Sequence, residues 1–411
     1  MKHIFKMLQT DVKFTMKVED FIAHSGPKIT YTKQPLQSEF FVKSHPLLFE
    51  QGISDVEITM AKWDDVPCFF PTNDKSTIPF DVFAASFYML SRYEEYLPYV
   101  KDEHGRYPAT ESLAFKNDFL KLPVVDFWIL KLKTALQDKF PDTPFGWGDY
   151  QHVSVIDVAS AYAFRKKGVV RNVGGALTDA FQLKFNRIAF RILVLAGLKK
   201  DPLDVFDELI KVHKKKHIEA VYFFLLGDYS GYDKNVSYNK TKFRTLIKSV
   251  ADYSIVSLMA SYTSTANLMQ LKEERKRLIN IVNRPVKRVR LRFNRLTIPE
   301  SYRMEVDAEF NEDYTMGYTK HLGFRAGTCT PFQFYDISFE EQLPLKVNPF
   351  CIQYTALNSA NKEECKKYIH QLKSIVKRVD GKFITVFSNE VLDFENNSEF
   401  KKLYIEEILN D

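Results

Sequence analysis

From about residue 151 to its end, the sequence alternates short apolar runs with longer amphipathic segments. This alternation restricts the possible folds more than any other feature does. The apolar runs, rich in branched and aromatic residues, predict strands at 153–158, 220–227, 254–259, 286–293 and 383–387, with a short extended segment at 323–327. The amphipathic segments predict helices at 201–213, 243–250, 266–282 and 361–379. Repeated strand–helix units predict an α/β fold, either a parallel sheet or a (β/α) barrel that is distorted or incomplete.

The first 148 residues have a different pattern. Residues 1–60 contain only weak strand signals, whereas Phe80–Leu90 and Leu122–Leu136 have apolar residues at helical spacing. The polar end of the first helix, Ser91–Tyr96, is expected to be solvated, and a binding face is the alternative. Pro141–Gly148 is dense in proline and glycine, as domain boundaries often are. We therefore predict a smaller α+β accessory domain over residues 1–148 and the strand–helix domain over residues 149–411.

Composition excludes several classes of protein. Hydrophobic residues make up 45% of the 411 residues and charged residues 27%, which indicates a globular chain. The net charge of +6 is small, and the basic stretch 273–295 has a single aromatic residue, Phe293, and no interleaved set for stacking bases, so no nucleic-acid partner is expected. The four cysteines form no C-x-x-C pair and are expected to be free thiols. The amino terminus lacks the apolar core of a signal peptide, and no segment is apolar enough to span a membrane. We expect a cytoplasmic protein without membrane contact.

Asp157 is the first candidate functional residue, because it lies near the carboxyl end of the strand at 153–158. Two interpretations fit its position. A carboxylate at the carboxyl end of a parallel strand faces the usual active-site mouth. The same residue type also caps turns that follow strands. His213 and His217 have metal-ligand spacing, but the three lysines between them disfavour a cation.

Five segments occur in the order of one known family: Val155–Gly168, Phe224–Asp228, Ser257–Tyr262, Gly323–Phe332 and Thr385–Glu390. Together they resemble a polysaccharide deacetylase-like (NodB-homology, carbohydrate esterase family 4) domain. Pro79–Tyr96 and Gly105–Tyr107 resemble the extra N-terminal domain of one bacterial branch of that family. The resemblance covers most of the chain and implies a distorted (β/α) barrel. Members of the family use a divalent metal such as zinc to remove acetyl groups from sugars.

The resemblance also implies that most of the active site is missing. Asp157 matches the catalytic base, and Arg325 matches the arginine that orients it. The three metal-ligand positions hold Ala159, Met259 and Arg292, and the position of the acid holds Ser388. We therefore expect no metal and no other cofactor, although His321, near Arg325, is an alternative ligand. Asp157 would need another positive partner, and we predict that Arg292 or Arg325 lies within hydrogen-bond reach of it.

Three hypotheses follow. The first is a non-catalytic deacetylase homologue that binds a carbohydrate ligand or a protein partner in polysaccharide metabolism. The second is an active carbohydrate deacetylase, a hydrolase with unusual ligands. The third is a structural scaffold for an active paralogue.

Overall fold

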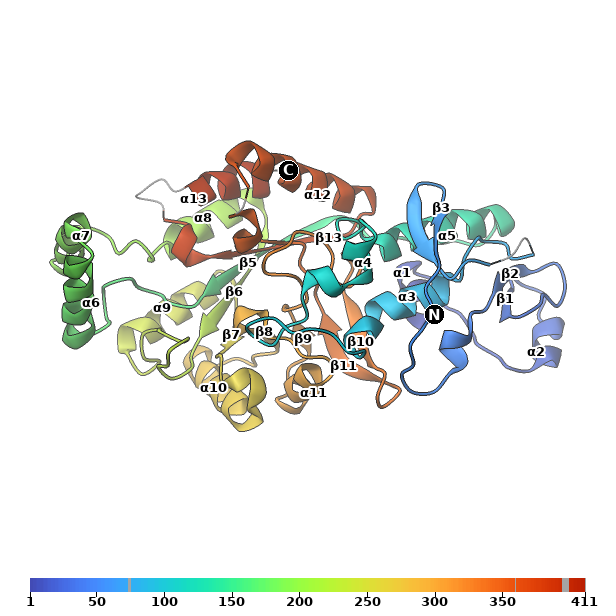
Figure 1. The fold of residues 1–411 in the computed structure, drawn as a ribbon, viewed down its shortest axis with the longest axis horizontal. Coiled ribbons are helices and arrows are strands. Elements are labelled where there is room, and N and C mark those ends of the chain that lie inside the picture. The colour runs from blue at the N-terminus through green and yellow to red at the C-terminus, as the bar shows by residue number, and fades with distance from the viewer. Residues whose placement is uncertain (73–74, 359, 394–398, 411) are drawn as a thin grey trace.

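A nine-stranded sheet forms the centre of the molecule (Figure 1). The computed structural model describes residues 1–72, 75–358, 360–393 and 399–410. The strands lie in the order β10-β11-β9-β8-β7-β6-β5-β13-β12, and all neighbours are parallel except β10 and β11. Their bounds are β5 Gln151–Val158, β6 Glu219–Leu225, β7 Ile255–Ala260, β8 Arg288–Leu291, β9 Glu312–Asp313, β10 Phe332–Asp336, β11 Glu341–Val347, β12 Ile352–Gln353 and β13 Lys382–Ser388. The predicted α/β class with a large parallel sheet is confirmed.

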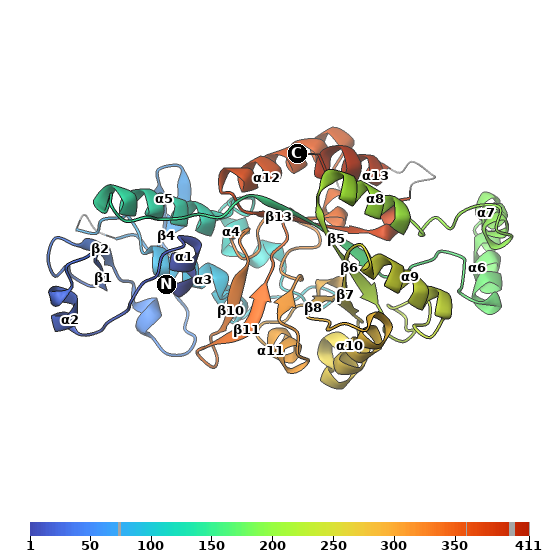
Figure 2. The same cartoon turned by 180° about the vertical axis from the view of Figure 1, so that it is seen from behind.

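Helices connect successive parallel strands or follow the last strand, β13, and they lie around the sheet (Figure 2). They are α8 Phe206–Lys216, α9 Thr241–Ala251, α10 Leu268–Val282, α11 Glu300–Asp307, α12 Lys362–Arg378, α13 Glu399–Leu403 and the π-helical turn Tyr404–Ile408. The predicted capping box opens α12, where the Asn361 side chain accepts from the backbone N–H of Glu364 and the Glu364 carboxylate accepts from the backbone N–H of Asn361. Two more helices, α6 Val169–Phe181 and α7 Phe185–Leu195, lie between β5 and α8. No described helix is long and apolar enough to cross a bilayer.

The sheet is strongly curled. β5 and β8 are separated by β6 and β7, so a flat sheet would place them about 14 Å apart. Yet the side chains of Arg290 in β8 and Asp157 in β5 meet, with Nε of Arg290 2.9 Å from Oδ1 of Asp157. The rings of Phe223, in β6, and Tyr314, just after β9, are likewise only 5.4 Å apart between centroids. The curl encloses a second apolar core made by the inner faces of β5, β6, β7 and β13. Within the described residues β10 and β12 are not paired with each other, and closure into a barrel remains a prediction.

The N-terminal elements pack against the β10–β11 side of the sheet. Their bounds are α1 Lys2–Met7, α2 Val18–Ala23, β1 Ile29–Thr32, β2 Phe40–Lys43, β3 Met60–Trp63, β4 Val66–Phe69, α3 Val82–Leu90, α4 Leu113–Lys116 and α5 Val124–Lys139. One continuous core joins them to the outer face of the sheet. For example, Phe87 packs edge-on against Tyr335, and the N–H of Val125 donates to the carbonyl of Gly327. The division into two domains at residue 148 therefore stays a prediction.

Several predicted details were wrong. The helix expected from Asp201 begins only at Phe206, because the Asp201 carboxylate accepts backbone N–H groups of the loop after β5, at residues 163–165. Residues 323–327, expected to be extended, form a turn rather than a strand. The end of α3, expected to be solvated, is buried at Arg92, Glu94 and Glu95. All four cysteines are free thiols, as predicted, and all are buried.

Candidate functional site

The carboxyl ends of β5, β6, β7, β8 and β13 meet at one edge of the curled sheet, which we call the mouth. Asp157 lies opposite Ser388 of β13 on one side and opposite Phe223 of β6 on the other. Met259 of β7 lies opposite Arg290 of β8. Because side chains alternate between the faces of a strand, Asp157 and Ala159 lie on the same inner face of the sheet. The sequence prediction that Asp157 is near the end of a buried strand is confirmed.

An ion pair between Asp157 and Arg290 is the centre of the mouth. Nε of Arg290 donates to both Asp157 oxygens, at 2.9 and 3.2 Å. The two Nη atoms donate to the carbonyl of Tyr314 and to the side-chain oxygens of Asn294 and Gln353. The guanidinium also lies over the Phe350 ring, 4.8 Å from its centroid. The Arg290 side chain is only 1% exposed and that of Asp157 15%, so the pair is largely removed from water.

The prediction that Arg292 or Arg325 pairs with Asp157 was wrong, because the partner is Arg290. Arg292, two residues beyond Arg290, instead donates to the Met259 sulfur at 3.9 Å and to the Tyr232 carbonyl at 3.4 Å. It also lies 3.5 Å from a carboxylate oxygen of Asp233. β8 ends at Leu291, and the turn at 292–294 carries Arg292 away from Asp157.

Arg325 belongs to a separate buried cluster. It forms a two-pronged interaction with Glu95, at 2.9 and 2.6 Å, and the same carboxylate accepts from Arg92 at 2.7 Å. Arg92 also contacts Glu94 at 2.6 Å. Burial by itself would raise the pKa of Glu95, but Arg325 and Arg92 outweigh it and lower that pKa below its ordinary value. The cluster fastens the end of α3 to the segment before β10, a link that no local sequence pattern revealed.

The other positions taken from the family pattern contain no metal-binding arrangement. Ala159 and Met259 are buried in the inner apolar core, and Ser388 is buried while its hydroxyl caps the turn that follows β13. His321 packs edge-on against Phe115. His213 is buried against Tyr404 and Tyr222. Over the described ranges of the chain, no group of three or more His, Cys, Asp or Glu side chains is placed to hold a metal ion.

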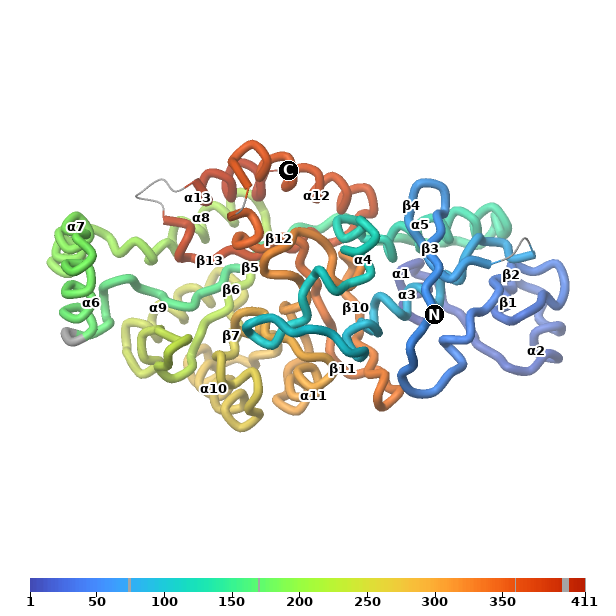
Figure 3. The backbone as a smooth tube through the Cα atoms, in the orientation of Figure 1, coloured from blue at the N-terminus to red at the C-terminus, as the bar shows by residue number. Residues whose placement is uncertain are grey.

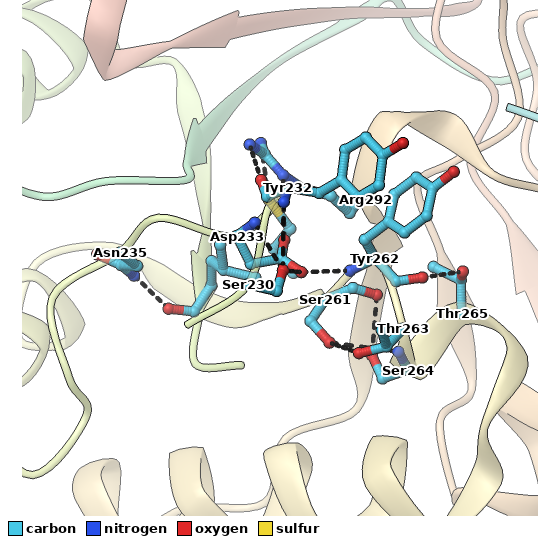
Figure 4. Close-up of polar contacts among 12 residues, drawn as sticks. Ser230, Tyr232, Asp233, Asn235, Ser261, Tyr262, Thr263, Ser264, Thr265 and Arg292 are labelled. Atoms are coloured by element: carbon cyan, nitrogen blue, oxygen red, sulfur yellow. Dashed lines mark hydrogen bonds and ion pairs between the residues drawn. The ribbon is translucent and has the colours of Figure 1, made fainter. Parts of the chain in front are cut away.

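Aromatic side chains from the loops after β6, β7 and β8, and one from the segment between α3 and α4, border the mouth. We call Tyr232, Tyr262, Phe293 and His104 the aromatic platform. The rings of Tyr232 and Tyr262 are stacked, with centroids 3.9 Å apart, and His104 stacks on Phe293 at 4.9 Å (Figure 4 shows the two tyrosines). Tyr232 is 50% exposed. Arg292 joins this platform to the inner core, because it contacts both Tyr232 and Met259.

Polar groups beneath the platform hold its loops in place. One Asp233 carboxylate oxygen accepts from the backbone N–H of Tyr262 at 3.0 Å (Figure 4). Glu274 of α10 accepts from both the N–H and the hydroxyl of Ser261 and from the hydroxyl of Ser264. Burial raises the pKa of Glu274 even though these hydrogen bonds lower it. The platform is therefore built on loops fixed by side-chain hydrogen bonds.

The interior behind the mouth is filled by side chains. Met259, Phe350 and Arg290 are each 2% exposed or less. Burial raises the pKa of Tyr354 to about 12, with further contributions from the charges of Glu390 and Asp157. A separate hollow of about 390 Å³ lies among residues at the amino ends of β5 and β13, where Lys2, Lys6, Lys346 and Lys382 line it. Because side chains fill the interior and this hollow lies at the amino ends of the strands, any ligand at the mouth would lie on its rim rather than in a deep cavity.

Comparison with known proteins gives one family and several distant structures. Residues 1–141 match the model of a family of unknown function (DUF7033). No curated protein matches the sequence.

Among solved structures, a Mycobacterium smegmatis protein assigned as a polysaccharide deacetylase is 10% identical, with a TM-score of 0.40 over 64% of this chain and 86% of its own. The 4-alpha-glucanotransferase of Thermococcus litoralis is 12% identical, with a TM-score of 0.37 over 64% of this chain and 37% of its own. A mutant of a CE4 family pseudoenzyme with restored enzymatic activity is 11% identical, with a TM-score of 0.29 over 64% of this chain and 68% of its own. Similarities this weak carry no information about the chemistry of the mouth, which follows only from the residues of this chain.

Proposed function

We propose that this chain is a non-catalytic polysaccharide deacetylase-like protein that binds a carbohydrate at the mouth of its sheet. The observation that carries the proposal is the Asp157–Arg290 ion pair beside an aromatic platform whose Tyr232 ring is exposed. An arginine supplies the positive charge beside the carboxylate that matches the family's base. In this proposal the mouth keeps a surface for ligand binding, and the guanidinium of Arg290 takes the place of the family's metal cation.

The residues at the remaining family positions support the absence of catalysis. A metal in such a site would polarise the acetyl carbonyl and generate the nucleophilic water. Ala159 offers no ligand atom, and the soft thioether of Met259 is a poor ligand for the hard or borderline cations that carboxylates and imidazoles bind. The Met259 sulfur also accepts a hydrogen bond from Arg292, which brings a second positive charge to this position.

The platform supports the choice of a carbohydrate as ligand. The exposed Tyr232 ring gives an apolar face with a polar edge, which matches the C–H face and the hydroxyl-bearing edge of a pyranose ring. Arg292 lies beside Tyr232 and is 21% exposed, so it supplies a charged donor for hydroxyl groups. A few oriented polar groups next to aromatic surface are typical of small-molecule sites.

Substitution of Tyr232 tests the proposal. We expect Tyr232→Ala to weaken binding of chito-oligosaccharides about tenfold, because removing one aromatic contact costs on the order of 1.4 kcal/mol. Isothermal titration calorimetry of the full chain measures the affinity. Tyr253→Ala is the matched control, since Tyr253 is 68% exposed but precedes β7, at the other end of that strand.

Two results would contradict the proposal. Acetate release from acetylated chito-oligosaccharides by the unmodified protein, abolished by a chelator, would restore the active-deacetylase hypothesis. Saccharide binding that is absent, or equally weakened by Tyr253→Ala, would show that the platform is not a carbohydrate site.

A further inference from the structure

A helical hairpin of α6 and α7 stands away from the body of the protein. It lies at the end of the molecule opposite the N-terminal elements in both ribbon views (Figures 1 and 2). Connecting segments lead to it from β5 and from it to α8 (Figure 3). We call residues 163–200 the hairpin segment. None of the residues of the mouth or of the aromatic platform lies in this segment.

Polar groups lie between the two helices of the hairpin. Arg191 of α7 donates to the Asp179 carboxylate of α6 at 2.6 Å and to the carbonyl of Asn172 at 3.2 Å. Arg191 and Asp179 are only 7% and 4% exposed. Gly175 makes room for the guanidinium, since a Cβ there would lie 2.5 Å from an Arg191 nitrogen. An ion pair therefore shares with Val194 the space where a soluble hairpin normally places only apolar residues.

Apolar side chains instead point to the outside. Val173, Leu177 and Phe181 recur every four residues along α6 and form one stripe, and Ile192 and Leu195 are exposed on α7. The turn between the helices is the most apolar part, with Phe181 88% exposed, Leu183 75% and Phe185 63%. Exposed apolar surface of this extent marks a face that another surface covers.

The charge of the hairpin segment identifies what covers this face. Its single acidic residue is Asp179, whereas its basic residues number nine: Arg165, Lys166, Lys167, Arg171, Lys184, Arg187, Arg191, Lys199 and Lys200. Nine positive charges and one negative charge give the segment a net charge of +8. The whole chain has +6, so all other residues together have −2. A second copy of the hairpin would carry the same charge and be repelled, whereas an anionic surface would be attracted.

We propose that the hairpin docks onto an anionic membrane surface, with Phe181, Leu183 and Phe185 entering the headgroup–acyl boundary. Lys184 and Arg187, both exposed beside this tip, then lie at the level of the lipid phosphates. Amphipathic helices with basic residues bind bilayers in this way, through buried apolar area and attraction to anionic lipids. The expectation of no membrane contact rested on the lack of a spanning segment. Docking on the surface needs no such segment.

Vesicle co-sedimentation of the full chain tests the proposal. We expect binding to phosphatidylcholine vesicles that contain phosphatidylglycerol, and at least about tenfold weaker binding to pure phosphatidylcholine. The triple variant Phe181→Ser/Leu183→Ser/Phe185→Ser and the charge variant Lys184→Glu/Arg187→Gln should each weaken binding to the anionic vesicles by about tenfold or more. Raising the salt concentration should weaken it as well.

Exposed apolar residues elsewhere provide the matched control. Met269→Ser and Val100→Ser, at positions 77% and 73% exposed, should leave vesicle binding unchanged. All the substituted side chains are exposed, so circular dichroism should show an intact fold in every variant. No binding to anionic vesicles would overturn the proposal, as would equal binding to neutral vesicles. Loss of a dimer, in place of loss of vesicle binding, in the triple variant would assign the face to a second copy instead.

Discussion

Replacing Glu95 by alanine will lower the free energy of unfolding by about 4 kcal/mol or more, because it leaves two buried guanidinium groups without their shared carboxylate. Arg92 and Arg325 both donate to Glu95, and neither side chain is more than 2% exposed. Denaturant unfolding followed by circular dichroism measures the change. Glu103→Ala is the matched control, since Glu103 is 58% exposed and its contacts with Lys320 and Arg106 are surface ion pairs. We expect the control to cost less than about 1 kcal/mol.

The pH dependence of stability gives the same prediction a second readout. The pKa of Glu95 is lowered in the folded protein, below the ordinary value of 4.5, so the folded state holds this proton less tightly than the unfolded state does. The stability that Glu95 contributes is therefore present above its unfolded pKa and is lost as the pH falls through its folded pKa. Glu95→Gln should be less stable than the unmodified protein at neutral pH and should lose less stability on acidification below about pH 4.5. An unchanged acid dependence would show that the carboxylate is not held by its two arginines.

The second large effect is expected at the mouth. Arg290→Met removes the counter-charge of Asp157 and the donors to Tyr314, Asn294 and Gln353, and should lower the free energy of unfolding by about 3 kcal/mol. Asp157→Asn should lower the free energy of unfolding less when it is added to Arg290→Met than when it is made alone. A double-mutant cycle on the four proteins should give a coupling energy of about 1–3 kcal/mol.

A second cycle tests whether Arg290, rather than its neighbour, supplies the charge. Combining Asp157→Asn with Arg292→Met should give a coupling energy near zero, because Arg292 bonds to Tyr232 and Met259 and pairs with Asp233. Coupling of Asp157 to Arg292 and not to Arg290 would reverse this assignment. The positive partner of Asp157 would then be Arg292, the residue that the family pattern aligned with a metal ligand.

Local sequence patterns determined the secondary structure of the parallel sheet and its connecting helices. Continuous apolar runs gave β5, β6, β7 and β13, because strands covered on both faces contain few polar residues. The 3.6-residue apolar period predicted α9, α10 and α12. The alternation in β8 also grouped Arg288 and Arg290 on one face of the strand. These features depend only on residues a few positions apart.

Only the tertiary structure decided which of these residues meet. The curl of the sheet brings Arg290 to Asp157, 133 residues earlier in the chain, and the turn after β8 takes Arg292 elsewhere. Arg325 finds Glu95 across 230 residues, so a segment expected to be solvated became buried. The hairpin of α6 and α7 has apolar periodicity like that of a soluble helix pair, but it buries an ion pair beside Val194 and leaves an apolar stripe of α6 exposed. A periodic pattern shows that a helix or strand has two faces, and the packing of distant segments determines which face is buried.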